Sequence, residues 1–381
     1  MLNLIKEMKN YISGNYISQG YYKSFVPTSI NRQWQIENME VFHLLSQADR
    51  ELGRLDMYSK YIPNLELFIS MHVIKEATQS SRIEGTRTNM EEALLDKEDV
   101  PLDKRDDWEE VQNYIQAMDA AIAVMKDLPF SSLLIRETHK TLMQGVRGKN
   151  KQPGEFRTSQ NWIGGVTIND ATFIPPPHTS VPDLMSDIER FTHNENIFLP
   201  DLLKIALIHY QFETIHPFLD GNGRIGRLLI TLYLVNKGIL KRPILYLSDF
   251  FERNRGLYYD NLMTVRVKNN LDQWFKFFLV GVIETSQKGI QTFDSILQLE
   301  KQVTAQLQTL GSRAANAQKV VNYLYQRPML NAEKVSEIAA ISAPSAYKLI
   351  EELEKLNILK EITGGQRKRV YIFEDYLNIF K

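Results

Sequence analysis

The sequence predicts a mainly α-helical protein with one small β-hairpin, followed by a C-terminal winged helix-turn-helix module. Three observations predict this class. Apolar residues recur at helical spacing over most of the chain. A single stretch, 153–180, instead combines glycine, proline and β-branched residues. From about Gln318, three short helical patterns precede a Gly-Gly turn between two strand-like segments.

The first helical patterns cover Trp34–Leu55 and Leu65–Glu84, after a turn-rich segment, SFVPTSINRQ. Gly85 would end the second helix in the left-handed conformation. The tetrapeptide TNME at 88–91 resembles a capping box that opens the next helix. Two further helices are predicted before the hairpin, over Asp107–Met125 and Leu133–Met143.

In the stretch 153–180, strands over Val166–Ile168 and Ala171–Ile174 flank an Asn-Asp pair, which predicts a hairpin. The helical spacing then resumes. The helices predicted after the hairpin are Pro182–Asn194, Pro200–Thr214, Ile225–Asn236, Gly256–Val265 and Leu271–Leu299.

The C-terminal module is predicted to follow a linker near Thr309–Asn316. Its elements are helices over Gln318–Tyr325, Ala332–Ile338 and Ser345–Leu356 and strands over Leu359–Thr363 and Arg369–Phe373 around Gly364-Gly365. The wing residues Arg367-Lys368-Arg369 suit phosphate contacts. The presumed recognition helix carries Glu351, Glu352 and Glu354, which would repel a DNA backbone. The module is therefore predicted to bind either DNA or protein.

Composition sets the broad class. The chain has 381 residues, 43% hydrophobic and 24% charged, enough for two or three domains. A net charge of −1 argues against a chain that coats nucleic acid. With no cysteine, disulfides and thiolate chemistry are excluded. Because neither a signal peptide nor a membrane span is evident, we expect a soluble cytoplasmic protein without membrane contact.

The stretch HPFLDGNGRIGR, 216–227, concentrates the chemistry. Its GNGRIG fits G-x-G-x-x-G, but it follows a helical pattern rather than a strand, which argues against a dinucleotide fingerprint. A Walker A loop is absent. Glycines before a helix still suit an anion at the helix N-terminus. Arg224 and Arg227 would lie on the first turn at neighbouring positions, where an anion offsets their charge. The alternative is a surface turn with two solvated arginines.

His216 and Asp220 complete this set. A histidine can accept a proton from a hydroxyl near neutral pH. One carboxylate beside phosphates is the usual protein contribution to a Mg²⁺ site. A zinc site is the competing interpretation, but His209 lies seven residues earlier, about 10.5 Å along a helix. The two histidines could share a metal only if the helix ended between them.

This stretch resembles the signature of the Fic family, H-x-F-x-[DE]-G-N-G-R-x-x-R. The matching residues are His216, Phe218, Asp220, Gly221, Asn222, Gly223, Arg224 and Arg227. The resemblance covers about residues 20–300. It implies a Fic-fold helical bundle and a protein adenylyltransferase, an enzyme that moves AMP from ATP to a Ser, Thr or Tyr hydroxyl and releases pyrophosphate.

The resemblance also implies roles for individual residues. His216 would be the general base, Phe218 would hold the loop in the core, and Asp220 would coordinate Mg²⁺. The expected ATP contacts are His216, Gly221, Asn222, Gly223, Arg224, Ile225, Gly226, Arg227 and Tyr259. Tyr258 and Tyr259 both fall where relatives contact adenine, and we favour Tyr259. The segment 162–175 would be the flap that holds the target as an added strand.

A second match lies far away in the sequence. Ser80, Glu84 and Gly85 fit the inhibitory motif S/T-x-x-x-E-G/N of one Fic class. On physics alone, Glu84 would be an ordinary solvated residue in the last turn of its helix. The resemblance implies instead that Glu84 pairs with Arg227, which lowers basal activity. In some relatives the same glutamate also supports removal of AMP from the modified target, so this reverse reaction is a further hypothesis.

We therefore expect three parts: an N-terminal helical region with the inhibitory helix over 1–105, a Fic catalytic core with the flap over 106–308, and the winged module over 309–381. A homodimer is expected from relatives. Two alternatives stay open: transfer of another phosphate-containing group such as the γ-phosphate, and a DNA-binding regulator that senses nucleotide.

Overall fold

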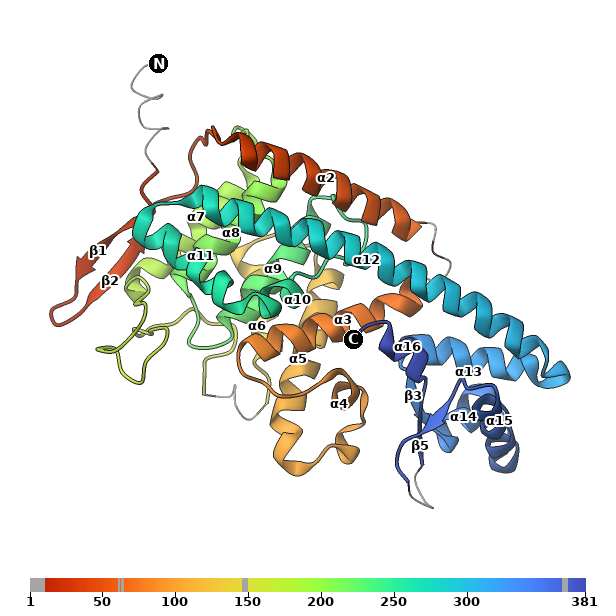
Figure 1. The fold of residues 1–381 in the computed structure, drawn as a ribbon. Helices are drawn as coiled ribbons and strands as arrows, with labels where there is room; N and C mark the ends of the chain where they lie inside the picture. The colour runs from red at the N-terminus through yellow and green to blue at the C-terminus, as the bar shows by residue number, and fades with distance from the viewer. Residues whose placement is uncertain (1–10, 61, 63–64, 146–149, 365–368) are drawn as a thin grey trace.

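The computed structural model describes residues 11–60, 62, 65–145, 150–364 and 369–381. Helices form most of this part of the chain, and the strands are short (Figure 1). None of the described helices is both long enough and apolar enough to cross a membrane.

The α-helices fall in a regular succession along the chain. They are α2 (Met39–Lys60), α3 (Leu65–Ile83), α4 (Met90–Leu94), α5 (Arg105–Val124), α6 (Ser132–Leu142), α7 (Val181–His193), α8 (Asp201–Ile215), α9 (Asn222–Asn236), α10 (Ser248–Arg253), α11 (Arg255–Lys268), α12 (Leu271–Gln308), α13 (Ala314–Gln326), α14 (Ala332–Ala339), α15 (Ala343–Lys355) and α16 (Glu374–Asn378). Short 3₁₀ turns connect some of them: η1 (Lys97–Asp99), η2 (Leu102–Lys104), η3 (His178–Ser180) and η4 (Gly311–Arg313).

Helices α8 and α9 lie at the centre of the core. Every residue of α8 from Leu202 to Ile215 is buried except Lys204. A helix that is apolar on all sides has to be surrounded by protein. Helix α9 packs against α8, and its residues are buried almost throughout. The connection between these two helices is the segment 216–221, which holds the candidate site.

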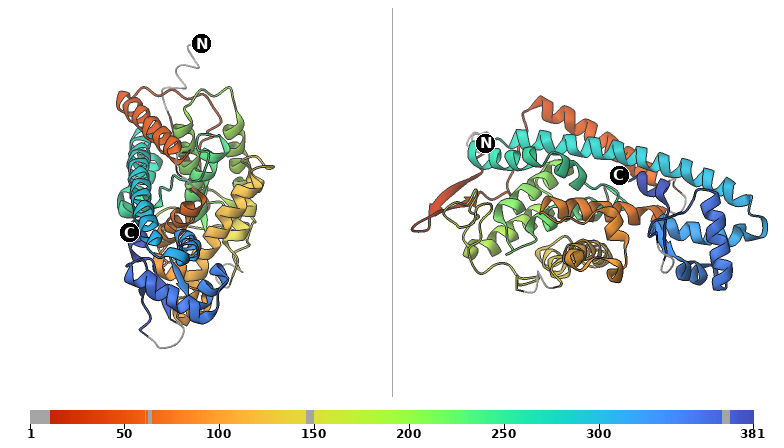
Figure 2. Two further views of the ribbon diagram at one scale, coloured as in Figure 1. Left: turned by 90° about the vertical axis from the view of Figure 1, so that its right-hand side faces the viewer. Right: turned by 60° about the horizontal axis from the view of Figure 1, so that its bottom comes forward.

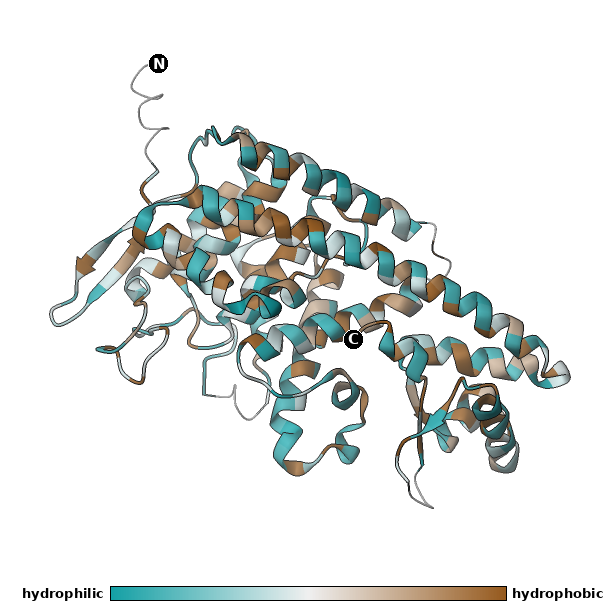
Figure 3. Ribbon diagram, viewed as in Figure 1, coloured by the Kyte–Doolittle hydropathy of each residue, from teal (hydrophilic) through white to brown (hydrophobic). Residues whose placement is uncertain are grey.

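Helices α2 and α12 form a long outer pair, lying side by side in both views (Figures 1 and 2). Hydrophobic and hydrophilic residues alternate along α12, as expected for an amphipathic helix (Figure 3). Helix α12 runs to Gln308, nine residues beyond the predicted end at Leu299. The predicted linker is correspondingly shorter, since Ala314–Asn316 already belong to α13.

Several predicted helix starts were wrong, and the caps explain why. Helix α2 begins at Met39 rather than Trp34, after Asn38, whose side chain accepts the Glu40 N–H at 3.0 Å. The capping box is formed by Asn89 and Glu92, one residue later than predicted. Helix α9 starts three residues before the predicted Ile225, which puts Arg227 beyond its first turn.

The flap lacks the two predicted strands. Its arms meet in a single antiparallel bridge between Ile163 and Phe173. The tip is instead a turn in which the Asp170 carboxylate accepts the N–H groups of Val166 (2.9 Å) and Thr167 (2.6 Å). The carboxylate satisfies donors that a ladder would otherwise have used, so the local geometry is a capped turn.

An N-terminal hairpin, which the sequence analysis missed, supports the flap. Strand β1 (Gly14–Ser18) pairs antiparallel with β2 (Lys23–Pro27). Strand β2 overlaps the segment SFVPTSINRQ, which the sequence predicts to be turn-rich. The Phe25 N–H donates to the Ile174 carbonyl at 2.9 Å, which joins this hairpin to the flap.

The C-terminal segment contains the three helices and the strand pair predicted for it, plus an unpredicted strand, β3 (Met329–Asn331). Strands β4 (Lys360–Glu361) and β5 (Val370–Ile372) complete an antiparallel sheet in the order β3-β5-β4. Gly365, Arg367 and Lys368 lie outside the described residues. The Arg327 guanidinium donates to the Leu94 carbonyl and to Asp96, which ties this segment to α4.

Candidate active site

The loop between α8 and α9 places His216 through an unusual backbone conformation. Helix α8 ends at Ile215, and His216 is left-handed with φ 50° and ψ 60°. Three hydrogen bonds from two side chains hold the loop. Arg157 Nε and Asn161 Nδ2 donate to the His216 carbonyl at 2.9 and 3.1 Å, and Asn161 Nδ2 also donates to the Phe218 carbonyl at 2.9 Å. Arg157 is 2% exposed, so this clamp is protected from water.

Phe218 anchors the same loop in the core, as predicted. It is fully buried and stacks on the ring of His139, with centroids 3.7 Å apart and an interplanar angle of 5°. The Gly154 N–H donates to His139 Nδ1 at 2.9 Å. The proton of neutral His139 therefore lies on Nε2, which donates to the Asp220 carbonyl at 3.1 Å.

Asn222 supports the loop with its side chain rather than reaching into the site. Its Oδ1 accepts the Phe218 N–H at 2.8 Å, and its Nδ2 donates to the Phe218 carbonyl at 2.9 Å. The side chain is buried, so only its backbone could contact a phosphate. Gly221, left-handed at φ 75°, is the N-cap of α9.

A cavity of about 500 Å³ opens beside this loop, between the flap, the start of α9 and α11. It is lined by Glu84, Trp162, Ile163, Gly164, Thr172, Phe173, Glu213, His216, Gly223, Arg227, Tyr258, Tyr259, Leu262, Met263 and Arg266. A volume of this size suits a nucleotide-sized ligand. Five residues singled out from the sequence thus meet at one cavity: His216, Gly223, Arg227, Tyr259 and Glu84.

The other predicted ATP contacts lie away from this wall. Ile225 is fully buried in the core. A Cβ at Gly226 would come within 2.2 Å of Glu213 Oε1, so this glycine makes room for a buried carboxylate. Arg224 does not line the cavity, because its guanidinium turns to Glu110 at 3.2 Å and Asp220 at 3.6 Å.

Arg227 is held by the predicted inhibitory segment. Its side chain is 1% exposed. Nε donates to Ser80 Oγ at 2.9 Å, and Nη2 donates to the Ser80 carbonyl at 2.9 Å and to Glu84 Oε1 at 2.7 Å. Glu84 is the first residue after α3 rather than part of its last turn. Burial raises the pKa of Glu84, but the contacts with Arg227 outweigh it and leave that pKa below its ordinary value.

Glu84 also reaches the N-terminus of α9, where a phosphate would be expected. A Cβ at Gly223 would lie 2.2 Å from Glu84 Oε1 and 3.0 Å from Arg227 Nη1. Gly223 is therefore needed for this close approach. The carboxylate occupies the positive end of the helix dipole, a position that favours anions.

The His216 imidazole is poised as a neutral base. Burial lowers its pKa to about 4, and the charges of Arg266 and Arg157 act in the same direction, while Glu84 opposes them. Its Nδ1 is buried without a hydrogen-bond partner. Because the ring is neutral at physiological pH, it can accept a proton from a hydroxyl at the cavity.

The neighbouring Tyr258 and Tyr259 differ in how far their side chains are exposed. Tyr258 is 1% exposed, and its hydroxyl lies 2.9 Å from His209 Nε2. Tyr259 is 39% exposed and lines the cavity, and its contact with adenine stays a prediction. His209 Nδ1 lies 2.8 Å from the Gly226 carbonyl. Both ring nitrogens of His209 thus have protein partners, which argues against the zinc interpretation.

The carboxylate groups near this loop could hold Mg²⁺ only together with a phosphate ligand. Within the described ranges, no three His, Cys, Asp or Glu side chains gather in a group that could hold a metal ion. Asp220, whose side chain is 44% exposed, is the carboxylate of this loop. Mg²⁺ in nucleotide sites commonly takes one or two carboxylates and completes its shell with phosphate and water oxygens. A lone Asp220 is compatible with that arrangement.

Sequence reasoning missed Glu213, three residues before His216. It is buried on α8, and its Oε1 has no hydrogen-bond partner. Burial raises its pKa to about 7, and Glu84 adds to the increase, while Arg227 and Arg266 oppose it. A charged residue inside an otherwise apolar helix was the signal that could have identified it. Arg266, whose guanidinium lies 3.9 Å from the centroid of the Phe173 ring, was also missed.

We predict that Glu213→Gln changes how stability depends on pH. A pKa raised from 4.5 to about 7 means that the fold keeps a proton that the unfolded chain releases. The wild type therefore loses stability as pH rises through about 7, whereas the glutamine variant does not. We compare the melting temperature of the variant with that of the wild type at each pH. From pH 5 to pH 8.5, this difference should shift by roughly 2–4 °C or more in favour of the variant.

Thermal unfolding followed by circular dichroism at each pH measures this difference. Glu66→Gln, which removes an exposed carboxylate from the first turn of α3, serves as the control. A melting-temperature difference between Glu213→Gln and wild type that stays constant over this pH range would contradict the assignment.

Comparison with known proteins places this geometry in context. The Fic/DOC family N-terminal domain matches residues 42–123, and the Fic/DOC family domain matches residues 129–234. A probable protein adenylyltransferase of Aquifex aeolicus is 26% identical over 243 residues, which span 62% of this chain and 70% of that protein. The protein adenylyltransferase Fic of Drosophila erecta is 34% identical over 132 residues, 33% of this chain but only 25% of that longer relative.

Solved structures show the same fold. A Fic family protein from Desulfovibrio desulfuricans matches with a TM-score of 0.59 and 20% identity, over 90% of this chain and 98% of that one. A Fic domain containing signaling protein from Bacteroides thetaiotaomicron matches with a TM-score of 0.53 and 19% identity, over 67% of this chain and 97% of that one.

Proposed function

Since the chain belongs to the Fic/DOC family, we propose that it is an autoinhibited protein adenylyltransferase, which transfers AMP from ATP to a hydroxyl of a protein. The observation that carries the proposal is the placement of a neutral imidazole, His216, on the wall of the cavity that also contains Gly223 and Arg227 at the start of α9. A base beside an anion-binding helix start is the pair of features that nucleotidyl transfer to a hydroxyl requires.

In the proposed reaction, the target hydroxyl loses its proton to the His216 imidazole. Its oxygen forms a bond to the α-phosphorus of ATP, and the bond from that phosphorus to the oxygen bridging to the β-phosphate breaks. Pyrophosphate leaves, and the target carries AMP. The clamp of Arg157 and Asn161 keeps the base in place during these steps. Mg²⁺, when bound, would be held by Asp220 and would neutralise phosphate charge.

The inhibited state follows from the contacts of Arg227. This arginine would be free to neutralise the terminal phosphate of ATP only if Glu84 moved away. As long as Glu84 lies against Gly223, it also takes the space that a phosphate would use. We therefore propose low basal transfer by the wild type. Removal of AMP from a modified target, aided by the Glu84 carboxylate, is a further proposal based on the family resemblance.

The flap supports the choice of a protein as acceptor. Gly164, Thr172 and the bridge Ile163–Phe173 line the cavity next to His216. An extended target segment could add to this edge through backbone hydrogen bonds, which would select for an accessible chain rather than a particular side chain. The acceptor could belong to another protein or to the chain itself.

The test of the reaction compares ATP labelled at the α- and the γ-phosphate. We expect protein-bound label from α-labelled ATP alone, measured after gel separation, because AMP transfer retains the α-phosphate and releases the others. Protein-bound label from γ-labelled ATP alone would show phosphate transfer instead and would overturn the proposal. If neither form of labelled ATP leaves label on protein while the chain still binds ATP, a regulator that only senses nucleotide would be favoured.

The C-terminal segment is proposed to be a winged helix-turn-helix module with DNA or protein as its partner. On α15, Glu352 is engaged by Arg313, which reduces the negative charge of this helix. A salt-dependent shift of DNA in a gel by the full chain would support DNA binding. If no shift occurs, the partner of the module would be a protein, which includes a second copy of this chain.

A further inference from the structure

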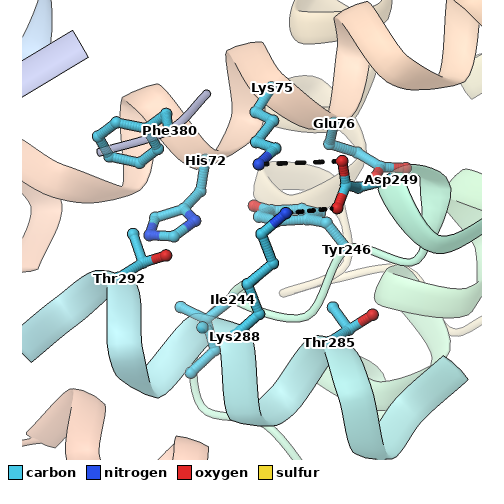
Figure 4. Close-up of a pocket in the computed structure, with 11 residues that line it drawn as sticks. His72, Lys75, Glu76, Ile244, Tyr246, Asp249, Thr285, Lys288, Thr292 and Phe380 are labelled. Atoms are coloured by element: carbon cyan, nitrogen blue, oxygen red, sulfur yellow. Dashed lines mark hydrogen bonds and ion pairs between the residues drawn. The ribbon is translucent and has the colours of Figure 1, made fainter. Parts of the chain in front are cut away.

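A second cavity, next to α3, is lined by charged side chains from three helices. Its walls come from α3, from α10 and the segment before it, from α12 and from the C-terminal Phe380. The lining residues are His72, Lys75, Glu76, Ile244, Tyr246, Asp249, Thr285, Lys288, Gly289, Thr292 and Phe380. Figure 4 shows Lys75 and Lys288 pointing toward Asp249 from two different helices, with the His72 ring beside them.

The two lysines of this cavity share one carboxylate. Lys75 Nζ lies 3.9 Å from Asp249 Oδ1, and Lys288 Nζ lies 2.9 Å from Oδ2. Arg253 Nε also lies 3.4 Å from Oδ2, but its Nη2 lies 3.8 Å from Glu284 Oε2, so this arginine has a second carboxylate partner. Lys75 is only 14% exposed, and its burial lowers its pKa to about 8, as expected when a buried cation is only partly compensated.

The second carboxylate of the cavity wall, Glu76, already accepts three hydrogen bonds from other residues. Glu76 accepts hydrogen bonds from the Tyr114 hydroxyl at 3.0 Å and from Ser248 through its N–H (3.1 Å) and its hydroxyl (2.5 Å). Burial raises the pKa of Glu76, while the hydrogen bonds from Ser248 and Tyr114 and the charge of Arg227 oppose the increase. These hydrogen bonds direct the Glu76 carboxylate toward Ser248 and Tyr114.

His72 provides an independent sign that a polar ligand belongs here. The residue is 8% exposed, and its Nε2 is buried without a hydrogen-bond partner. Its ring is held between Phe293 and Phe380, with centroids 4.9 and 5.1 Å away. A buried polar atom without a partner is costly unless something fills the space beside it.

The size of the cavity restricts the ligand. Its volume of about 50 Å³ corresponds to roughly four water-sized positions. This is enough for a tetrahedral oxyanion and too small for a nucleotide. The hydroxyl groups of Thr285 and Thr292, both on α12, line the same cavity and can donate hydrogen bonds.

We propose that this cavity binds a small tetrahedral oxyanion of the phosphate class between Lys75 and Lys288, with His72 as a further contact, and that the bound anion strengthens inhibition. The effect of the anion on inhibition rests on the proposed function. Helix α3 carries Lys75 in this cavity and Ser80 about 7.5 Å further along its axis, in contact with Arg227. An anion that ties α3 to α12 stabilises the arrangement in which Ser80 and Glu84 hold Arg227.

Binding is tested on the full chain by titration calorimetry with inorganic phosphate and with sulfate, against chloride at equal ionic strength. We expect saturable binding of phosphate or sulfate that weakens about tenfold or more in Lys288→Gln, since each lysine donates a charge-assisted hydrogen bond. Lys75→Met should have the same effect. Lys276→Gln removes a lysine of the same helix that pairs with Glu40 and should leave binding unchanged.

The outcomes separate the two halves of the proposal. Absence of saturable binding, or equal binding by wild type and Lys288→Gln, would overturn the anion site. For the coupling, phosphate at saturating ATP should lower AMP transfer by the wild type about fivefold and leave Lys288→Gln unaffected. Intact binding without any effect on transfer would overturn the coupling. If no AMP transfer is found at all, the proposed function fails, while calorimetry still decides whether the anion site exists.

Discussion

Glu84→Gly is expected to increase transfer of α-labelled AMP about 10- to 100-fold over wild type. The variant removes the carboxylate that accepts a charge-assisted hydrogen bond from Arg227 at 2.7 Å. Such a bond contributes about 1.5–3 kcal/mol, and each 1.4 kcal/mol corresponds to about a tenfold change. Because Glu84 follows the end of α3 and precedes Gly85, glycine is tolerated there without breaking the helix.

The measurement is the initial rate of label incorporation at saturating ATP. Glu66→Gly is the matched control, since Glu66 lies at the other end of α3 in an ion pair with Arg242 whose side chains are both more than half exposed. Such surface pairs contribute little. An unchanged rate in Glu84→Gly, with the melting temperature retained, would mean that the pair with Arg227 is structural and not inhibitory.

His216→Asn, introduced into the Glu84→Gly background, is expected to lower AMP transfer by about 10²- to 10⁴-fold, the usual contribution of a general base. Asparagine is chosen because it tolerates the left-handed conformation that His216 adopts at φ 50°. It has no basic group at neutral pH, so the loss reports on chemistry rather than on the loop. His216→Ala should give a loss of similar size.

The control is His43→Ala, because His43 is an exposed histidine of α2 remote from the cavity. Binding of ATP, measured separately by calorimetry, should change little in His216→Asn. If label transfer survived this substitution, another group would have to take the proton, and Glu213, on the same cavity wall, would be the next candidate.

The sequence by itself determined most of the helices and located the residues on which the proposed chemistry depends. Helical spacing located α3, α5, α6, α7 and α8 to within two residues at each end, because these helices bury a continuous apolar face or are apolar throughout. The run 216–227 predicted a base and an anion-binding helix start, because glycines let the backbone approach an anion and arginines near a helix start are stabilised by one. The family resemblance added the partner of Arg227, which the geometry of Ser80 and Glu84 matches.

Local sequence patterns gave the wrong secondary structure where contacts between distant segments determine it. The flap was predicted as two strands from its β-branched residues, but the Asp170 carboxylate caps a turn there. The backbone of its second arm bonds to Phe25 of the N-terminal hairpin, far away in the sequence. Strand β2 was missed for the same reason: its register depends on a partner strand and on the flap rather than on its own sequence.

Tertiary structure alone decided which of the signature residues face the cavity. His216, Gly223 and Arg227 do. Arg224 turns instead to Glu110, and the Asn222 side chain turns back to Phe218. It also brought Glu213 and Arg266 to the wall and packed His72, Lys75 and Lys288 around a second cavity. The physical reason is that spacing along a helix fixes the direction of a side chain, while burial, charge and hydrogen-bond partners come from segments far away in the chain.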